Sequence, residues 1–196
     1  MKTGRHAVVL AAGAGRRFGG RKLLAGWRGE PLVLAAVRRA LSARVDSVTL
    51  VVGSDAAAVT AAVATLEDSR LRIVAAPNWS EGMGASLGAG VRSLPADAAK
   101  AVVFLGDMPA IPDKLADQLL DALDGAHVAA RTISPHGPAH PVAFARDMFE
   151  SLAGLTADQG ARSLLSMLGP RVAGVFTDDP GVVFDVDRPE DLTRRA

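Results

Sequence analysis

Short runs of apolar residues alternate with longer stretches rich in alanine and leucine through the first half of the chain. The runs lie at 6–10, 48–52, 71–75 and 101–105, and their length and β-branched content are typical of buried strands. The stretches between them lie at 32–41, 56–66 and 83–94 and have the composition of helices. Strands separated by helices form parallel sheets that helices cover on both faces. The alternation therefore predicts an α/β fold of three layers, α/β/α, around a mostly parallel, Rossmann-like sheet.

The second half of the chain is less regular. Its predicted elements are a helix over 113–123 capped by Asp113, a strand over 127–131, helices over 146–152 and 158–168, strands over 172–176 and 182–184, and a terminal helix over 188–192. Residues 134–144 contain Pro135, Pro138 and Pro141, so we expect a loop with a short edge strand there. No linker or repeat divides the sequence. We expect a single domain over residues 1–196, since one domain typically takes about 100–200 residues.

The composition restricts the class of protein. The chain has 22 Lys and Arg against 21 Asp and Glu, a basic excess too small for a typical nucleic-acid-binding domain. It has no cysteine, which excludes disulfides, thiolate metal sites and cysteine nucleophiles. Gly13 and Gly15 interrupt the first apolar run, which therefore makes a poor signal peptide and no membrane span. We expect a cytoplasmic protein that binds a small anionic ligand, with no nucleic-acid or membrane partner.

The first predicted strand leads into a loop rich in glycine and cations, Leu10–Lys22. Its glycines and cations are Gly13, Gly15, Arg16, Arg17, Gly19, Gly20, Arg21 and Lys22. Glycines let the backbone come close to a ligand, and the cations favour a polyphosphate. The spacing from Gly13 through Gly15 to Gly19 is one residue too long for a dinucleotide-binding fingerprint. A P-loop requires Lys directly after its last glycine, where this chain has Arg21 after Gly20.

Carboxylates follow the later strands. Asp107 comes just after the strand over 101–105, at the edge of the sheet where ligands of parallel α/β proteins bind. Asp113 is better placed than Asp107 to cap the next helix, so a metal is the more specific role for Asp107. Mg²⁺ takes few protein ligands, and one carboxylate of the pair Asp185 and Asp187 would suffice as the second. Residues two apart in a strand share a face, so the sequence leaves open which of the pair it is.

The loop fits a third pattern, L-A-A-G-x-x-x-R-hydrophobic-G-x-x-K. It resembles the signature of nucleotidyltransferases with the nucleotide-diphospho-sugar transferase fold, and within them the molybdenum cofactor cytidylyltransferase group. The family's further blocks occur in the same order at 78–87, 105–109, 140–142, 160–162 and 185–192. Two positions depart from the family's frequent residues, Ala139 in place of Gly and Arg188 in place of Thr. Both lie where an acceptor could bind, so they concern the acceptor's identity more than the type of reaction.

The resemblance implies the transfer of CMP from CTP to the phosphate of molybdopterin, with Mg²⁺ and with release of pyrophosphate. In such a reaction the charge of the triphosphate must be neutralised, and an ionised phosphate nucleophile needs no strong general base. Lys22 is expected to offset charge at the α-phosphate, and Arg17 to pair with the β- or γ-phosphate. The sequence Ala-Ala-Gly goes with cytidine-preferring members of the family, and a Cβ at Ala12 would narrow the base pocket. Arg16 and Arg21 are expected to form a solvated basic turn.

The resemblance also implies the rest of the site. The expected nucleotide-binding residues are Leu10, Ala11, Ala12, Gly13, Ala14, Gly15, Lys22, Gly82, Met83, Gly84 and Ser86. The expected metal ligands are Asp107, Asp185 and Asp187, and the expected acceptor-binding residues are Trp79, His140 and Arg162. A molybdoenzyme that receives the product is the implied protein partner. The alternatives are a nucleotidyltransferase that uses GTP or another phosphorylated acceptor, such as a sugar phosphate, and a non-catalytic molybdopterin carrier.

Overall fold

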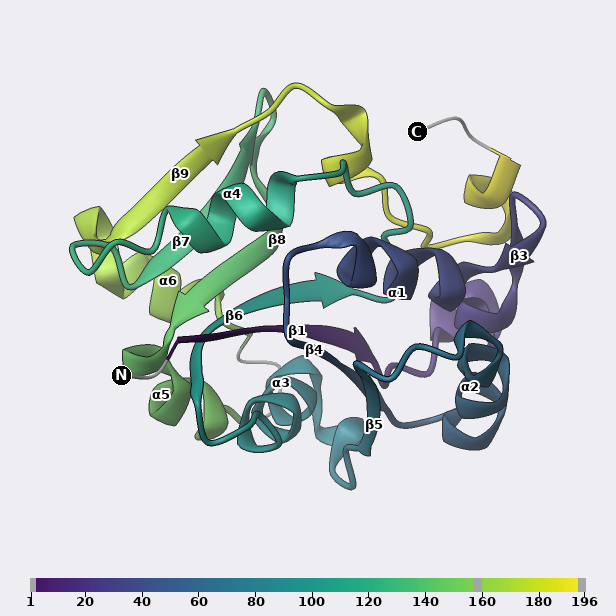
Figure 1. Ribbon diagram of the computed structural model, residues 1–196. Helices are drawn as coiled ribbons and strands as arrows, with labels where there is room; N and C mark the ends of the chain where they lie inside the picture. Colours follow the sequence, from purple (N-terminus) through teal and green to yellow (C-terminus); the bar gives the residue numbers. More distant parts are fainter. Residues whose placement is uncertain (1–2, 157–159, 194–196) are drawn as a thin grey trace.

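A seven-stranded sheet forms the centre of the molecule (Figure 1). The computed structural model describes residues 3–156 and 160–193. In spatial order the strands are β5 (Leu71–Ala75), β4 (Ser47–Val52), β1 (Gly4–Ala11), β6 (Ala98–Leu105), β8 (Gly137–Ala145), β7 (Ala129–Ser134) and β9 (Val172–Phe176). Neighbouring strands are parallel except that β8 runs antiparallel to both β6 and β7. The sheet is therefore mostly parallel, as the sequence predicted.

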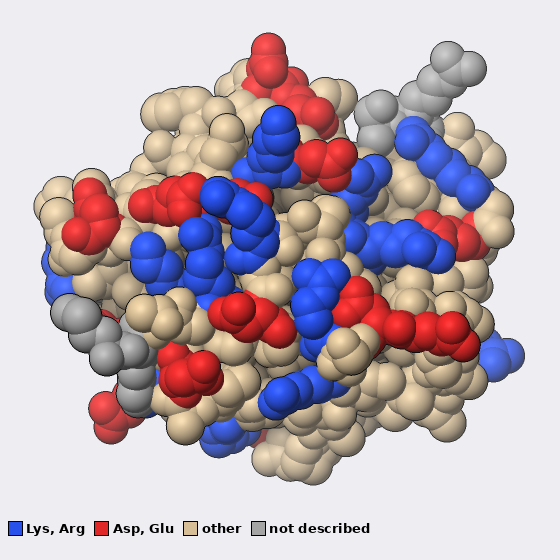
Figure 2. Space-filling view, viewed as in Figure 1, with Lys and Arg blue, Asp and Glu red and all other residues tan. Residues whose placement is uncertain are grey.

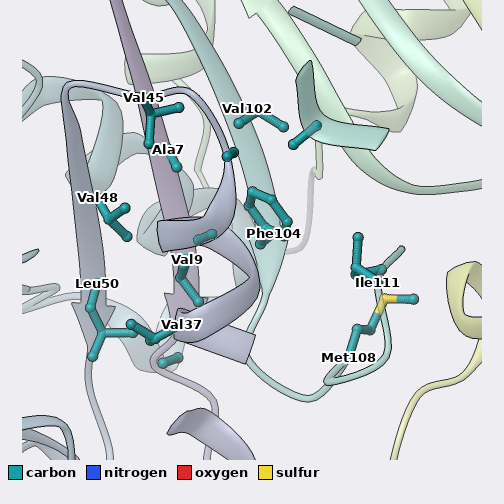
Figure 3. Packing of buried hydrophobic residues seen from close by; sticks show 14 of the residues in the cluster. Ala7, Val9, Val37, Val45, Val48, Leu50, Val102, Phe104, Met108 and Ile111 are labelled. Atoms are coloured by element: carbon teal, nitrogen blue, oxygen red, sulfur yellow. The ribbon is translucent and has the colours of Figure 1, made fainter. Parts of the chain in front are cut away.

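Helices cover both faces of the sheet and complete the three expected layers. One face carries α1 (Leu32–Ser42), α2 (Ala56–Val63) and α4 (Leu115–Asp121), and the other carries α3 (Met83–Arg92), α5 (Phe149–Ala153) and α6 (Arg162–Leu168). Side chains alternate between the two faces along β1, because Val9 packs with α1 and its neighbour Val8 packs with α3. Figure 3 shows Val9, Val37 and Phe104 in the first of these two cores. Burial on both faces explains why these strands are continuous apolar runs.

Strand β8 corrects the expected loop and short edge strand over 134–144. It is nine residues long and lies inside the sheet, between β6 and β7. The pairing of β7 with β8 skips His140 and Pro141, so Pro141 lies in a bulge, and β6 pairs only with the part of β8 from Val142 onward. Prolines are tolerated at bulges and where a strand has one neighbour, because no ladder hydrogen bond is then lost. The prolines therefore did not exclude a strand.

Several smaller expectations were also wrong. Residues 182–184 are not a strand, since Pro180–Val183 form a 3₁₀ helix. The terminal helix is a single 3₁₀ segment, Pro189–Thr193. Asp113 does not cap α4, because it pairs with Arg39 at 2.8 Å and the helix begins after Lys114.

Two further differences concern segments between the expected elements. The helix expected over 158–168 begins at positions outside the described residues, and its described part is α6. A two-stranded hairpin of β2 (Gly26–Trp27) and β3 (Glu30–Pro31) was not expected. Its turn residues, Arg28 and Gly29, both have positive φ, which suits a two-residue hairpin turn.

Helix α3 lies very close to the sheet. A Cβ added at Gly90 would lie 2.7 Å from Cγ1 of Val8 and 2.8 Å from Cγ2 of Val51, so only glycine fits between the helix and strands β1 and β4. This contact sets the close spacing between α3, which begins at Met83, and strands β1 and β4.

The surface carries charges of both signs. Figure 2 shows acidic and basic side chains interspersed over one face of the molecule, in keeping with a net charge of +1. Among the described residues, every helix is too short or too polar to cross a membrane.

Candidate active site

A cavity of about 490 Å³ lies where the segments following β1, β5 and β6 meet. Its lining residues are Leu10, Ala12, Gly13, Ala14, Gly15, Arg16, Arg17, Phe18, Lys22, Trp79, Ser80, Gly82, Met83, Ser86, Leu105, Asp107 and Asp187. Parallel strands end at the same edge of a sheet, so the topology brings these distant segments together. Most residues singled out from the sequence therefore share one cavity. The exceptions are Ala11, Gly84, His140, Arg162 and Asp185, of which Ala11 and Gly84 are buried in the packing of β1 and α3.

The glycine loop closes on itself in a tight turn. Gly15 has φ of 58°, and its carbonyl accepts hydrogen bonds from the amides of Phe18 at 3.0 Å and Gly20 at 3.1 Å. A Cβ at Gly15 would lie 2.8 Å from the Cβ of Lys22, so both the left-handed backbone and the lack of space require glycine. At Gly13, by contrast, no described residue other than Gly13 and its two chain neighbours lies within 4 Å of the position that a Cβ would take. The backbone of Gly13 thus borders open space in the cavity, where a ligand can approach it.

Lys22 lies between two carboxylates from distant parts of the chain. Its Nζ donates to Oδ2 of Asp107 at 2.6 Å and lies 3.6 Å from Oδ1 of Asp187. Arg17 donates to the other oxygen of Asp187 at 3.0 Å. The side chain of Lys22 is 12% exposed and that of Arg17 is 81% exposed, so water screens the Arg17 pair far more than the Lys22 pair. The largely buried cation and its two carboxylates form the charged centre of the cavity.

Backbone hydrogen bonds place Asp187 in the cavity. The amide of Val186 donates to the carbonyl of Asp107 at 3.1 Å, and the carboxylate of Asp191 accepts from the amide of Asp187 at 3.0 Å. These bonds hold the C-terminal segment against the loop that follows β6. Partial burial raises the pKa of Asp185, and the charges of Asp107 and Asp187 raise it further. Asp185 is thus a neighbour of the charged centre, while Asp187 is the member of the pair that lines the cavity.

The cavity also borders the N-terminus of α3. Gly82 is the N-cap residue with φ of 132°, Met83 begins the helix, and Ser86 lies one turn further on. The first amides of a helix have no partner within the helix and carry partial positive charge. This end of the cavity therefore suits an anionic or polar ligand group.

Trp79 forms part of the cavity wall and is supported from behind by Ala12 and Gly53. A Cβ on Gly53 would lie 2.7 Å from Cγ of Trp79 and 2.8 Å from the Cβ of Ala12, so the three residues stack closely. Ala12 is only 3% exposed and belongs to the core against which Trp79 packs. The methyl group of Ala12 thus shapes the cavity largely through its support of the Trp79 ring.

His140 and Arg162 lie outside the cavity lining. The Nδ1 atom of His140 is buried and has no hydrogen-bond partner among the described residues. Burial lowers the pKa of His140, the charge of Asp107 and the Val103 backbone oppose this shift, and the charge of Arg162 adds to it. His140 is therefore within electrostatic reach of both Asp107 and Arg162. Its Nδ1 is thus an unused polar atom in the part of the sheet formed by β8, β7 and β9.

Sequence reasoning missed four residues that line the cavity, namely Arg16, Phe18, Ser80 and Leu105. Arg16 was expected in a solvated turn, and the fold of the loop brings it to the rim beside Arg17. Ser80 lies inside the block 78–87 that was already singled out, so its place in that block was a usable signal. Leu105 is the last residue of β6 and the first residue of the block 105–109, so its place in that block was also a usable signal.

The charged centre fits a divalent cation. A single ammonium nitrogen, that of Lys22, contacts both Asp107 and Asp187, so one cation can bridge these two carboxylates. Over residues 3–156 and 160–193 no group of three or more His, Asp or Glu side chains is arranged to hold a metal by itself. A two-carboxylate site agrees with Mg²⁺, which usually completes its octahedron with substrate oxygens and water.

Two curated relatives align with nearly the whole chain. The purine catabolism protein PucB of Bacillus subtilis is 30% identical over 198 residues, which cover 96% of this chain and 95% of PucB. Nicotine blue oxidoreductase of Paenarthrobacter nicotinovorans is 32% identical over 207 residues, which cover 95% of this chain and 94% of that protein. The names of the two relatives indicate different activities, so these matches support common descent more than a common substrate.

The fold and the glycine loop match a family of nucleotidyltransferases. The crystal structure of Rv0371c from Mycobacterium tuberculosis H37Rv superposes with a TM-score of 0.84 and 30% identity, covering 97% of this chain and 96% of that one. A second structure of Rv0371c is a complex with manganese, with a TM-score of 0.78 and 28% identity over 96% of each chain. The profile of the MobA-like NTP transferase domain matches residues 7–172, a span that includes the glycine loop, Lys22 and Asp107. The chain therefore belongs to the MobA-like NTP transferase family.

Proposed function

We propose that this nucleotidyltransferase transfers CMP from CTP to the phosphate group of molybdopterin, with Mg²⁺ as its cofactor. The observation that carries the proposal is the position of Lys22 between Asp107 and Asp187, beside the glycine loop. This arrangement brings the cation needed at an α-phosphate and the carboxylates needed for a metal to one point. The Ala-Ala-Gly sequence at 11–13 supports cytidine as the base.

The residues of the cavity supply charge and position for the reaction. The acceptor phosphate is already ionised, so one of its oxygens attacks the α-phosphorus of CTP directly. A new P–O bond forms, the bond between the α-phosphorus and its bridging oxygen breaks, and pyrophosphate leaves with the electron pair. The backbone from Gly13 to Gly15 binds the phosphates, Arg17 pairs with the β- or γ-phosphate, and Lys22 offsets charge at the α-phosphate. When bound, Mg²⁺ would neutralise triphosphate charge, held by Asp107 and Asp187.

The acceptor is proposed to bind beside β8. His140 has an unpartnered Nδ1 that is buried in the free protein, and its lowered pKa keeps the ring neutral at neutral pH, so it would bind through a hydrogen bond an acceptor that reaches this atom. Arg162 supplies a cation for an anionic acceptor group, and Trp79 supplies a flat apolar ring at the boundary with the nucleotide. Another phosphorylated acceptor is the alternative, because Ala139 and Arg188 differ from the residues frequent in the family.

Pyrophosphate release tests the proposal. The purified protein is incubated with Mg²⁺ and each of CTP, GTP, ATP and UTP, with and without molybdopterin. Release that requires both CTP and molybdopterin is the expected result. Release with GTP and molybdopterin would overturn the base assignment. No release with any nucleotide, together with tight binding of molybdopterin, would favour a carrier.

A further inference from the structure

We propose that the outer edge of β9 is an interface at which two copies of this chain pair into one continuous sheet. β9 pairs with β7 on one side, and in the described part of the chain no strand pairs with its other side. Figure 1 shows β9 at the rim of the sheet, beyond β7. The edge of such a strand presents backbone amides and carbonyls that can accept another strand.

The opposite edge of the sheet is protected in a way that β9 is not. β5, at that edge, contains Arg72, an exposed cation within the strand. β9 reads Val-Ala-Gly-Val-Phe, with neither a charge nor a proline, and its last residue, Phe176, is 81% exposed. Charged residues and prolines are the usual means by which an edge strand avoids pairing. The β9 edge is thus open to pairing, with a large apolar ring beside it.

The charges around β9 favour a second copy of the same chain as the partner. Arg171 precedes the strand, and Asp178 and Asp179 follow it. All three are exposed, and none of them forms an ion pair with another described residue. Antiparallel pairing of two copies sets the start of each strand beside the end of the other. Arg171 of each copy then lies near the two aspartates of the second copy, so opposite charges meet at both ends of the interface.

The register that pairs all five residues places Gly174 on the two-fold axis. Val172, Gly174 and Phe176 share one face of the strand, because side chains alternate. In this register Phe176 of each copy lies opposite Val172 of the other, and Gly174 lies opposite Gly174. Within one copy, the Phe176 ring already lies beside Gly174, since a Cβ added at Gly174 would lie 3.7 Å from Cε2 of Phe176. The second copy therefore covers two aromatic rings that are exposed in one copy alone.

The interface goes beyond the proposed activity and does not rest on it. Strands β8 and β7 separate β9 from β6, whose end carries the loop of Asp107. Pairing at β9 thus leaves the cavity open, and loss of pairing should leave the chemistry intact.

Sedimentation velocity of the full chain tests the pairing. Over about 1 to 100 μM, a range that detects micromolar association, the expected result is a rise from the mass of one chain toward the mass of two. Phe176→Lys removes the apolar contact and adds a cation at the edge, and it should weaken association at least about tenfold. Met167→Lys, at a residue of α6 that is 75% exposed, is the matched control and should change nothing. A single chain at every concentration, or association that Phe176→Lys leaves unchanged, would overturn the proposal.

A cross-linking experiment tests the register. Because the chain has no cysteine, Gly174→Cys introduces one thiol at the proposed axis. Added oxidised glutathione should oxidise the two thiols of a pair to one disulfide, giving a dimer that dithiothreitol separates. Ile73→Cys at the β5 edge is the matched control and should remain a single chain. Equal cross-linking of the two variants would contradict an interface at β9.

Discussion

The two halves of the sheet are built differently. β5, β4, β1 and β6 are parallel throughout, and every residue of β4 is buried. β8, β7 and β9 include an antiparallel strand with a bulge, and two residues of β9 are exposed. In the first half, β1 leads into the glycine loop and β6 leads into the loop of Asp107. In the second half, the bulge of β8 contains His140. The comparison suggests that the groups proposed to bind the nucleotide need rigid support, while the side proposed for the acceptor tolerates irregular structure.

The largest expected effect comes from the charged centre of the first half. Lys22→Ala should lower kcat by about 100- to 1,000-fold, since the charge proposed to develop at the α-phosphate would then have no cation beside it. Arg21→Gln, at an exposed residue of the same loop outside the cavity, is the control and should retain activity. Steady-state pyrophosphate release measures the effect. Near-normal turnover by a folded Lys22→Ala protein would refute the role of Lys22.

A pair of leucines tests whether the two halves differ in stability. Leu50 in β4 is fully buried, and its replacement by Ala should lower the free energy of unfolding by about 3 kcal/mol. Leu164 in α6 is only partly buried, and the same replacement should cost about 1 kcal/mol. Urea denaturation of both variants gives the two values. Equal losses would mean that α6 and the sheet face it covers are packed as tightly as the parallel half.

The same contrast explains what could be predicted from the sequence. Strands β1, β4 and β6 were predicted because residues buried on both faces read as apolar runs. β5 and β9 are apolar enough to have the predicted bounds although each has exposed residues. The length of β8 and its place inside the sheet were predicted wrongly, because a bulge depends on pairing with β7, which local composition does not record.

In the site, Asp107 was singled out by its place after a strand. Which of Asp185 and Asp187 lines the cavity depends on how the C-terminal segment lies against the loop after β6. A hydrogen bond from Val186 to Asp107 sets this position, and these two residues are far apart in the sequence. Their roles as metal ligands stay predictions.

Metal binding by the free protein tests the charged centre without reference to catalysis. Lys22→Met removes the ammonium that neutralises Asp107 and Asp187, so Mn²⁺ should bind the nucleotide-free variant about tenfold more tightly than the unsubstituted protein. Asp107→Asn should weaken the same binding. Isothermal titration calorimetry with Mn²⁺ alone measures both. Weaker binding by Lys22→Met would show that the two carboxylates do not form the metal site.

A smaller effect is expected in the second half of the sheet, beside which the acceptor is proposed to bind. His140→Asn should raise the KM for the acceptor about two- to tenfold, the effect of one lost hydrogen bond, and leave kcat and the KM for CTP unchanged. Initial rates at varied acceptor and saturating CTP give these constants. A change in the KM for CTP alone would place His140 with the nucleotide instead.

The smallest effect concerns acid stability. Burial lowers the pKa of His6 below its ordinary value of 6.5, against the opposing charges of Asp46 and Asp97. The unfolded chain then binds a proton that the folded chain does not, so this contribution is present above about pH 6.5 and is lost as the pH falls. The free energy of unfolding should fall less steeply between about pH 7 and 5 in His6→Gln than in the unsubstituted protein. The difference in the total fall should be less than about 1 kcal/mol. Denaturation at several pH values measures the slope, and an unchanged slope would assign the decline to other groups.

The contact of Gly90 with Val8 and Val51 has a consequence for engineering. Any larger residue at Gly90 requires Val8 and Val51 or the helix itself to shift, and a shift of α3 would carry the Gly82–Ser86 segment at the helix start with it. A search for variants with a new nucleotide preference can therefore include Gly90, although it lies outside the cavity lining. A methyl group added there could move Gly82, Met83 and Ser86, which line the cavity, without itself contacting a ligand.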